Sequence, residues 1–235
     1  MTPNTSAAVM NQRREPPDSL DYFPTPPWAA RAFCDHVFEG EAKKLIAYDP
    51  ACGEGHMVAG LRDAFGTVHG SDVFDYGRNF PVSDFLDTTL GTKSLPGGRV
   101  DWIITNPPFN AALDFLKAAF AARPRKGIAF LLRTVWLESG ERHKEIFDGP
   151  LRPVSVYISV DRIPMVKGRY DHGARSATSY AWFVFDVAQI ERCQTLRMNQ
   201  LPPVEVKWLP PGGRKKFYDR RDLTIGAWEP EGELI

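Results

Sequence analysis

Hydrophobic positions along the chain form two alternating patterns, short apolar runs typical of buried strands and longer stretches whose apolar positions repeat at helical spacing. We predict strands at Leu45–Tyr48, about Thr67–Val73, near Pro81–Phe85, and at Trp102–Thr105, Gly127–Trp136, Val154–Val160 and Tyr180–Phe185. We predict helices at Pro26–Phe38, His56–Phe65, Asn110–Ala122 and Glu138–Phe147. Strands that alternate with helices predict an α/β fold, a doubly wound, mostly parallel, Rossmann-like sheet of seven strands in a single domain.

The two ends of the chain differ in composition from this domain. Residues 1–20 are rich in proline, serine, asparagine and charge, which predicts a disordered segment. Residues 21–190 hold the alternating pattern, and residues 191–235, with Pro-Pro and Gly-Gly pairs, are predicted to form a basic, loosely attached extension. No stretch approaches about eighteen apolar residues, and the N-terminal segment has no hydrophobic core. We therefore expect no membrane span and no secretory signal, and we expect a cytoplasmic protein.

The composition is that of an ordinary soluble globular protein, with 43% hydrophobic and 25% charged residues. Three cysteines, Cys34, Cys52 and Cys193, show no metal-ligand spacing and leave an odd thiol, which fits a reducing compartment and predicts no metal site. The net charge of zero argues against a nucleic-acid partner, but twelve lysines and arginines stand against five acids between Arg162 and Arg221. Counting alone favours a nucleic-acid face and a merely solvated surface equally.

The segment Asn106-Pro107-Pro108-Phe109, directly after an apolar run, is suited to holding an amino group. A residue before proline is restricted to extended geometry, so the Asn106 and Pro107 carbonyls have fixed directions. The Asn106 side-chain oxygen and the Pro107 backbone oxygen can each accept one N–H of a planar NH2, while Phe109 offers a face for a flat ring. On its own, the tetrapeptide fits a purely structural turn about as well.

A glycine turn further upstream predicts a nucleotide-like ligand. The apolar run Leu45–Tyr48 leads into Asp49-Pro-Ala-Cys-Gly-Glu-Gly and then into an amphipathic stretch, an order that lets a ligand approach the backbone closely. The dinucleotide pattern requires a small residue three positions after Gly55, but Val58 is there, which weakens an NAD interpretation. Asp72, near the end of the next apolar run, suits bonds from ribose hydroxyls. Taken singly, Asp49 also suits a helix cap and Asp72 a turn.

Together these motifs resemble the S-adenosylmethionine-dependent amino-methyltransferases, most closely the DNA adenine-N6 group in its gamma arrangement. The resemblance covers roughly Tyr22 to Asp186, and it implies a class I methyltransferase domain over residues 21–190 with S-adenosyl-L-methionine as cofactor. It assigns cofactor contacts to Phe23, Pro24, Thr25, Asp49, Ala51, Cys52, Gly53, Gly55, Asp72, Asp84 and Phe85. It assigns catalysis to Asn106, Pro107 and Phe109.

The family usually adds a sizeable target-recognition domain, whereas only about fifty residues follow Asp186 here. We therefore expect a small, phage-type enzyme with loose or short sequence specificity. A long connection, residues 161–179, separates the last two predicted strands, and loops of this length are usually functional or disordered. We predict nucleic-acid contacts for five of its residues, Arg162, Lys167, Arg169, Tyr170 and Arg175. By the resemblance this connection helps to hold a flipped base, with Tyr170 or Trp136 stacking opposite Phe109.

The implied reaction is direct methyl transfer to the exocyclic N6 of adenine in DNA, after the base has left the stack. Acceptance of both N–H bonds at Asn106 and Pro107 favours a pyramidal nitrogen, so catalysis comes chiefly from positioning. Two other functions stay open. One is methylation of an RNA base or of a protein glutamine amide, although Phe109 in place of tyrosine and a short N-terminal segment fit the glutamine-acting family poorly. The other is a non-catalytic nucleic-acid-binding protein on the same fold.

Overall fold

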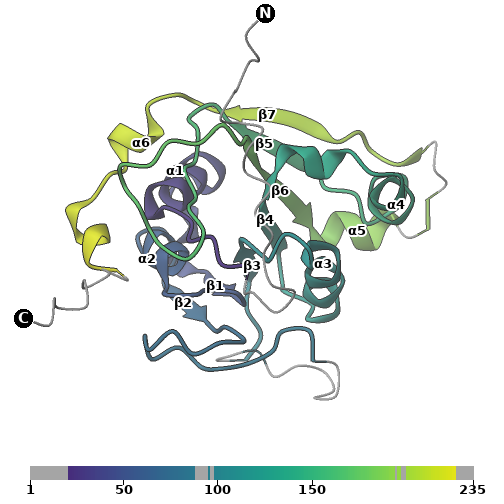
Figure 1. The fold of residues 1–235 in the computed structure, drawn as a ribbon. Helices are drawn as coiled ribbons and strands as arrows, with labels where there is room; N and C mark the ends of the chain where they lie inside the picture. Colours follow the sequence, from purple (N-terminus) through teal and green to yellow (C-terminus); the bar gives the residue numbers. More distant parts are fainter. Residues whose placement is uncertain (1–20, 88–94, 96–97, 194, 197–199, 226–235) are drawn as a thin grey trace, which may run out of the picture.

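The computed structural model describes residues 21–87, 95, 98–193, 195–196 and 200–225 and contains a sheet of seven strands (Figure 1). The segment predicted to be disordered, residues 1–20, lies outside the described residues. The strands are β1 (Ile46–Asp49), β2 (Thr67–Gly70), β3 (Trp102–Thr105), β4 (Gly127–Arg133), β5 (Ser155–Ser159), β6 (Tyr180–Asp186) and β7 (Glu205–Leu209), in the order β2-β1-β3-β4-β6-β5-β7. Strands β1 to β4 are parallel, β6 is antiparallel to β4 and β5, and β7 is parallel to β5. The predicted doubly wound, mostly parallel sheet is confirmed.

Helices cover both faces of the sheet, as Figure 1 shows. One face carries α1 (Pro27–Phe38) and α2 (His56–Arg62), and the other carries α3 (Ala112–Ala121), α4 (Gly140–Arg142) and α5 (Val187–Cys193). A short helix, α6 (Gly213–Lys216), packs against α1. Single turns complete the fold at η1 (Glu41–Lys44), η2 (Thr134–Leu137), η3 (His143–Phe147) and η5 (Arg220–Thr224). None of the described helices is long and apolar enough to cross a membrane.

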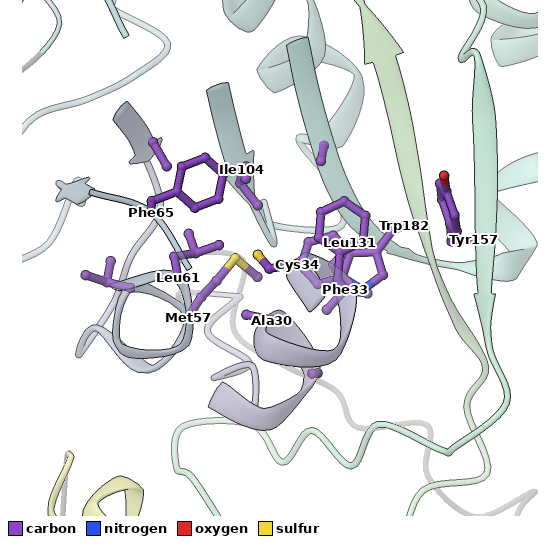
Figure 2. Packing of buried hydrophobic residues seen from close by; sticks show 14 of the residues in the cluster. Ala30, Phe33, Cys34, Met57, Leu61, Phe65, Ile104, Leu131, Tyr157 and Trp182 are labelled. Atoms are coloured by element: carbon purple, nitrogen blue, oxygen red, sulfur yellow. The ribbon is translucent and has the colours of Figure 1, made fainter. Parts of the chain in front are cut away.

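Each face has its own hydrophobic core because successive side chains of a strand point to opposite faces. On β4, Leu131 belongs to the core beneath α1 and α2, whereas Phe130 and Leu132 belong to the core beneath α3. In the first core, Phe33 of α1 stacks on Trp182 of β6 with ring centroids 4.2 Å apart, a contact visible beside Leu131 in Figure 2. Burial on both faces explains the nearly continuous apolar sequence of β4.

One predicted strand near β2 is absent from the structure, and one strand at the opposite edge was not predicted. Residues 81–85 form no strand, and a single isolated bridge joins Asp72 to Val82. Pro81 has no N–H to donate, so the pairing consists of two hydrogen bonds. The Asp72 N–H donates to the Pro81 carbonyl, and the Ser83 N–H donates to the Asp72 carbonyl. The seventh strand is instead β7, at the opposite edge of the sheet beside β5. The prediction of seven strands was therefore right in number and wrong in one member.

Two further boundaries are corrected near β4. The strand predicted to reach Trp136 ends at Arg133, and η2 begins at the next residue. The helix predicted from Glu138 to Phe147 consists of the short α4 followed by the π turn η3. The backbone N–H of Asp148 donates to the carbonyl of His143, the wider spacing of a π turn.

The C-terminal segment is attached more firmly than its composition predicts. Strand β7 extends the sheet, and the Arg31 guanidinium on α1 forms a two-bond ion pair with Asp222, with N–O distances of 2.6 and 2.7 Å. Asp222 is only 1% exposed. Residues 205–225 therefore belong to the domain, which corrects the expectation of a loose extension. The last ten residues, 226–235, lie outside the described part of the chain.

Candidate active site

A cavity of about 270 Å³ lies at the carboxyl ends of β1, β2 and β3. Parallel strands place their carboxyl ends at one edge of a sheet, so the loops that follow them meet there. The lining residues come from segments 21–25, 49–52, 56–57, 72–73 and 84–86, from Tyr76, and from Asn106, Pro108, Asn110, Ala111 and Phe115. The N-terminal segment, the turn after β1 and the tetrapeptide after β3, which are far apart in sequence, thus form one cavity.

Two glycines shape the turn between β1 and α2. Gly53 has a φ of +53° and Gly55 a φ of +90°, both in the left-handed region that favours glycine. A Cβ on Gly53 would overlap the Tyr22 ring, and one on Gly55 would lie 2.6 Å from the Phe80 ring. The Gly53 N–H donates to Asp72 Oδ2 at 2.8 Å. Both glycines shape the turn, and neither is among the residues that line the cavity, whereas Ala51 and Cys52 of the same turn line it.

Two carboxylates at the ends of β1 and β2 face the cavity. Asp49 is 1% exposed and accepts the Ala51 N–H at 3.2 Å, and burial raises the pKa of Asp49 to about 7. Asp72 accepts N–H bonds from Gly53 and from Phe74, the latter at 3.1 Å, and burial raises its pKa as well. Burial makes both groups costly to ionise, so a ligand that brings positive charge or hydroxyl donors would be favoured at this wall.

Asp84 and Phe85 form another part of the lining. The Asp84 Oδ1 accepts the Leu86 N–H at 2.8 Å, and no described residue donates to its Oδ2. The Phe85 ring is buried, with Tyr48 and Phe115 at ring-centroid distances of 6.1 and 5.4 Å. This part of the cavity therefore offers a fixed aromatic ring beside a carboxylate oxygen that can accept a hydrogen bond.

The Asn106 side chain is oriented by a backbone carbonyl. Its Nδ2 donates to the Phe23 carbonyl oxygen at 2.9 Å and lies 3.6 Å from the sulfur of Met165. Because a carbonyl oxygen only accepts, this contact determines which side of the amide carries the nitrogen. The opposite atom, Oδ1, is buried and has no hydrogen-bond partner among the described residues. A buried acceptor left unpaired costs about 1–3 kcal/mol, so Oδ1 is a site for a donor supplied by a ligand.

Phe109 faces a smaller hollow next to the cavity. Its backbone N–H donates to Asp21 Oδ2 at 2.7 Å, and its ring lies 5.2 Å from the Phe23 ring. The hollow has a volume of about 80 Å³ and is lined by Phe109, Leu132, Arg133, Val135, Trp136 and Arg142. Pro107 is buried, and neither Pro107 nor Phe109 lines the large cavity. Asn106 therefore faces the cavity and Phe109 the hollow.

The N-terminal segment forms one wall of the cavity with Phe23, Pro24 and Thr25. The Thr25 hydroxyl is a second buried polar group at the cavity without a partner among the described residues. Tyr22, which the motifs did not single out, covers the glycine turn. Its hydroxyl donates to Glu54 Oε2 at 3.0 Å and accepts the Glu54 N–H at 3.3 Å. The sequence feature that could have identified Tyr22 is its position directly before the Phe-Pro-Thr-Pro segment.

Within the loop 161–179, none of the five residues predicted to bind nucleic acid lines the cavity. Arg162 donates to Ser179, and Arg169 pairs with Asp171 at 3.8 Å. Lys167 and Arg175 also lie on this loop, and Arg175 is exposed. The loop meets the site through other atoms, since the Gly168 N–H donates to the Tyr22 carbonyl at 2.9 Å and Met165 contacts Asn106. Figure 1 shows the loop running past α6 and α2.

Of the two residues expected to stack opposite Phe109, Tyr170 lies elsewhere and Trp136 lies beside Phe109. The Tyr170 ring lies 4.9 Å from the His56 ring at the start of α2, not against Phe109. Trp136 lines the hollow together with Phe109. His56 is buried, its Nε2 donates to the Ile225 carbonyl at 2.9 Å, and burial lowers its pKa to about 4. Tyr170 and His56 thus join the loop and the C-terminal segment to the glycine turn.

Solved structures of three proteins share this fold. The methyltransferase subunit of a type I restriction-modification system from Streptococcus thermophilus matches with a TM-score of 0.50 and 14% identity, over 69% of this chain and 44% of that chain. A proposed RNA methyltransferase from Pyrococcus horikoshii matches with a TM-score of 0.53 and 16% identity, over 77% of this chain and 94% of that chain. A modification subunit of a proposed type I restriction enzyme from Vibrio vulnificus matches with a TM-score of 0.50 and 15% identity, over 86% of this chain and 51% of that chain.

These likenesses establish the fold. The chain spans about half or less of the length of the two restriction-modification subunits. No protein-family model matches the chain, and no curated protein matches it significantly in sequence. The class I, Rossmann-like methyltransferase fold predicted from the sequence is confirmed.

Proposed function

We propose that this protein transfers a methyl group from S-adenosyl-L-methionine to the exocyclic N6 amino group of adenine in DNA. The target base leaves the stack to reach the site, and the sequence preference is loose or short. The observation that supports this proposal most directly is the Asn106 amide, whose nitrogen is held by the Phe23 carbonyl while its buried Oδ1 lacks a donor. An NH2 group supplies that donor.

The cavity fits the cofactor through its unpaired groups and its shape. Thr25 Oγ1 is buried without a partner among the described residues, and the turn after β1 brings Ala51 and Cys52 to the cavity wall. When bound, the cofactor supplies an electrophilic methyl group on a sulfonium. In our proposal Asp49 lies near its cationic amino-acid part, and Asp72 accepts hydrogen bonds from its ribose hydroxyls.

The adenine of the cofactor takes the remaining part of the cavity. Asp84 Oδ2 is able to accept a hydrogen bond from an amino group, and the Phe85 ring, held between Tyr48 and Phe115, gives a flat apolar surface for a purine. Phe23, Pro24 and Thr25 close the methionine side, with Ala51 and Cys52 beneath.

At the target base, this chain positions and orients the nucleophile. Adenine's amino nitrogen is a poor nucleophile because its lone pair is delocalised into the ring. The Asn106 Oδ1 and the Pro107 carbonyl each accept one N–H, which turns the lone pair out of the ring plane, and Phe109 stacks on the base. Holding the reacting atoms about 3–3.5 Å apart contributes up to about 7–11 kcal/mol of the barrier reduction. The methyl would bond to the nitrogen as its bond to the sulfonium sulfur breaks and leaves the electron pair on sulfur, and the nitrogen would then release one proton to water.

An RNA base would use the same geometry, so the experiment must offer both polymers. Methylation-free duplex DNA, single-stranded DNA, RNA and a protein fraction are each incubated with isotopically labelled S-adenosylmethionine. Nucleosides and amino acids from the digests are identified by mass spectrometry. We expect labelled N6-methyldeoxyadenosine. Label only in RNA, or only in glutamine, contradicts the proposed substrate, and no label in any polymer contradicts enzymatic activity.

The Asn106→Ala variant tests the mechanism. It removes the unpaired acceptor, so we expect kcat to fall by about 10²–10³-fold, the effect of deleting one preorganised hydrogen-bonding group from an active site. The dissociation constant of S-adenosylhomocysteine serves as the control, and we expect it to change less than about threefold. A variant that methylates at the parent's rate with unchanged cofactor affinity removes Asn106 from the mechanism.

A further inference from the structure

Among the described residues, the lining of the hollow beside Phe109 has two cationic side chains and no acid. It lies at the ends of β3 and β4, and Arg133 and Arg142 line it together with the rings of Phe109 and Trp136. Its volume of about 80 Å³ is far below the roughly 300 Å³ at which small-molecule pockets begin. The hollow therefore suits one small group, and the charge of its lining favours an anion.

Arg142 has a structural role that leaves its charge uncompensated. Its guanidinium lies 5.4 Å from the Trp136 ring and donates to the carbonyls of Trp136 at 2.6 Å and of Glu138 at 3.0 Å. These contacts hold the turn after β4. No described carboxylate forms an ion pair with Arg142, so its positive charge acts on the hollow.

Arg133 has more freedom. It ends β4 and is exposed, and its side chain has neither a hydrogen bond nor an ion pair with any described residue. Its recorded contact is with the Phe109 ring, whose centroid lies 4.9 Å from the guanidinium carbon. The acid nearest to this ring in the described contacts is Asp21, which accepts the Phe109 N–H and does not line the hollow. Among the described residues, Arg133 is therefore a cation without an anionic partner.

The position of Arg133 conflicts with stacking on Phe109. The rings of Phe23 and Tyr180 pack against the Phe109 ring, with centroids 5.2 and 6.2 Å away, and the exposed Arg133 guanidinium lies over the Phe109 ring. A base that stacks on Phe109 must displace the guanidinium. The anion that always accompanies such a base is a phosphate of its own strand, and the planar guanidinium fork binds phosphate with two parallel hydrogen bonds.

We propose that the hollow is a phosphate subsite for the strand that carries the target base, and that Arg133 moves from the Phe109 ring to this phosphate when the base stacks. The inference rests on the proposed function and narrows it. A glutamine side chain has no phosphate linked to its amide, whereas every base of a strand is linked to one, so the subsite selects a nucleic-acid strand. Arg133 is then a binding residue of the same reaction.

The experiment measures binding of adenine-containing oligonucleotides at several salt concentrations with saturating S-adenosylhomocysteine. Arg133→Gln removes the charge, and Arg133→Lys keeps it without the fork. Arg99→Gln removes an exposed charge that precedes the amino end of β3, whereas the hollow lies at the carboxyl ends of β3 and β4. We expect Arg133→Gln to weaken binding about 10- to 100-fold and to lower the slope of log K against log salt by about 0.9 for duplex or 0.7 for single strands. Arg133→Lys keeps the parent's slope, and Arg99→Gln keeps both slope and affinity.

A second measurement identifies the phosphate. Oligonucleotides in which single phosphates next to the target adenine are replaced by uncharged methylphosphonates are bound to the parent and to Arg133→Gln. At one position the replacement should weaken the parent about as much as the Arg133→Gln change does, and should have no effect on that variant. Cofactor affinity, measured in parallel, should be equal in all variants.

The outcomes separate this inference from the proposed function. If the parent methylates adenine but Arg133→Gln has the parent's slope and affinity, the subsite is wrong and the function stands. If Arg133→Gln lowers the salt slope as expected and one methylphosphonate position weakens only the parent, but the parent methylates no adenine, the subsite stands and the function is wrong. If the parent binds no oligonucleotide, or if every phosphate position affects Arg133→Gln as it affects the parent, the subsite is refuted.

Discussion

Replacement of Asp49 by asparagine is expected to stabilise the unliganded protein above neutral pH. The Asp49 carboxyl is buried, and its pKa rises from 3.8 to about 7. Between these values the unfolded chain is ionised while the folded protein holds the proton, so folding takes up a proton and stability falls as pH rises. Above about pH 7 the loss is complete. The difference between the two pKa values corresponds to about 4 kcal/mol.

Asparagine removes this penalty at little structural cost. It has nearly the shape of aspartic acid, and its Oδ1 can still accept the Ala51 N–H that Asp49 accepts now. Relative to the parent, the unfolding free energy of Asp49→Asn should therefore grow by about 3 kcal/mol between pH 5 and pH 8. Urea unfolding followed by tryptophan fluorescence at several pH values measures this difference.

Asp101→Asn is the matched control, because it makes the same chemical change at a buried carboxylate whose charge is compensated. Asp101 accepts the Ile46 N–H at 2.8 Å and pairs with Arg125 at 3.3 Å. Its replacement should cost about 1.5–3 kcal/mol, the range for hydrogen bonds to charged groups. If Asp49→Asn is no more stable than the parent at pH 8, or if its advantage does not grow with pH, burial is not what determines the Asp49 pKa.

The same variant tests the cofactor assignment. If the ionised Asp49 carboxylate faces the cationic part of the cofactor, binding is linked to proton release. The affinity of the parent for S-adenosylmethionine should then rise about tenfold per pH unit below pH 7 and level off above it. Asp49→Asn should bind more weakly at pH 8 and show no such rise in calorimetric titrations. Equal affinity in parent and variant at pH 8 contradicts the assignment.

Two further variants test the turn and the C-terminal attachment. Gly53→Ala should lose about 1–3 kcal/mol of stability and most of its cofactor affinity, because φ is +53° and the new Cβ overlaps the Tyr22 ring. Gly77→Ala, with a φ of +69° and open space around it, measures the backbone cost alone. Arg31→Met leaves the buried Asp222 carboxylate without its partner and should cost about 3–5 kcal/mol in urea unfolding. A loss below about 1 kcal/mol would mean that the ion pair does not hold the C-terminal segment.

Local sequence was sufficient for the central strands and insufficient for the edge. Strand β3 was predicted with its observed bounds, because a strand buried on both faces needs an apolar residue at almost every position. Strand β7 was missed. Prolines at 202–203 and 210–211 flank it, and two of its side chains, Val206 and Trp208, are 52% and 58% exposed. Its existence depends on the open edge of β5, about fifty residues earlier, which no local pattern reveals.

In the candidate site, too, the sequence reveals the motif residues but not the contacts that orient them. The acids, the glycines and the Asn-Pro-Pro-Phe tetrapeptide are recognisable because chemistry restricts residue types at short spacing. The contacts that orient them are long-range. Phe23 and Asn106 are 83 positions apart, and Asn106 and Met165 are 59 apart. Arg133 gave no signal at all, because an arginine at the end of a strand is ordinary in any sequence.

The N-terminal segment 21–25 explains how such distant parts form one site. Tyr22 bonds through its hydroxyl to the glycine turn and through its carbonyl to the loop 161–179. The Asp21 carboxylate holds the backbone N–H of Phe109. Between these contacts, the Phe23 carbonyl determines which face of the Asn106 amide points to the unpaired position. The orientation of the proposed catalytic oxygen therefore depends on a backbone atom, which side-chain replacement cannot remove. Only a displacement of segment 21–25 would allow the Asn106 amide to turn over.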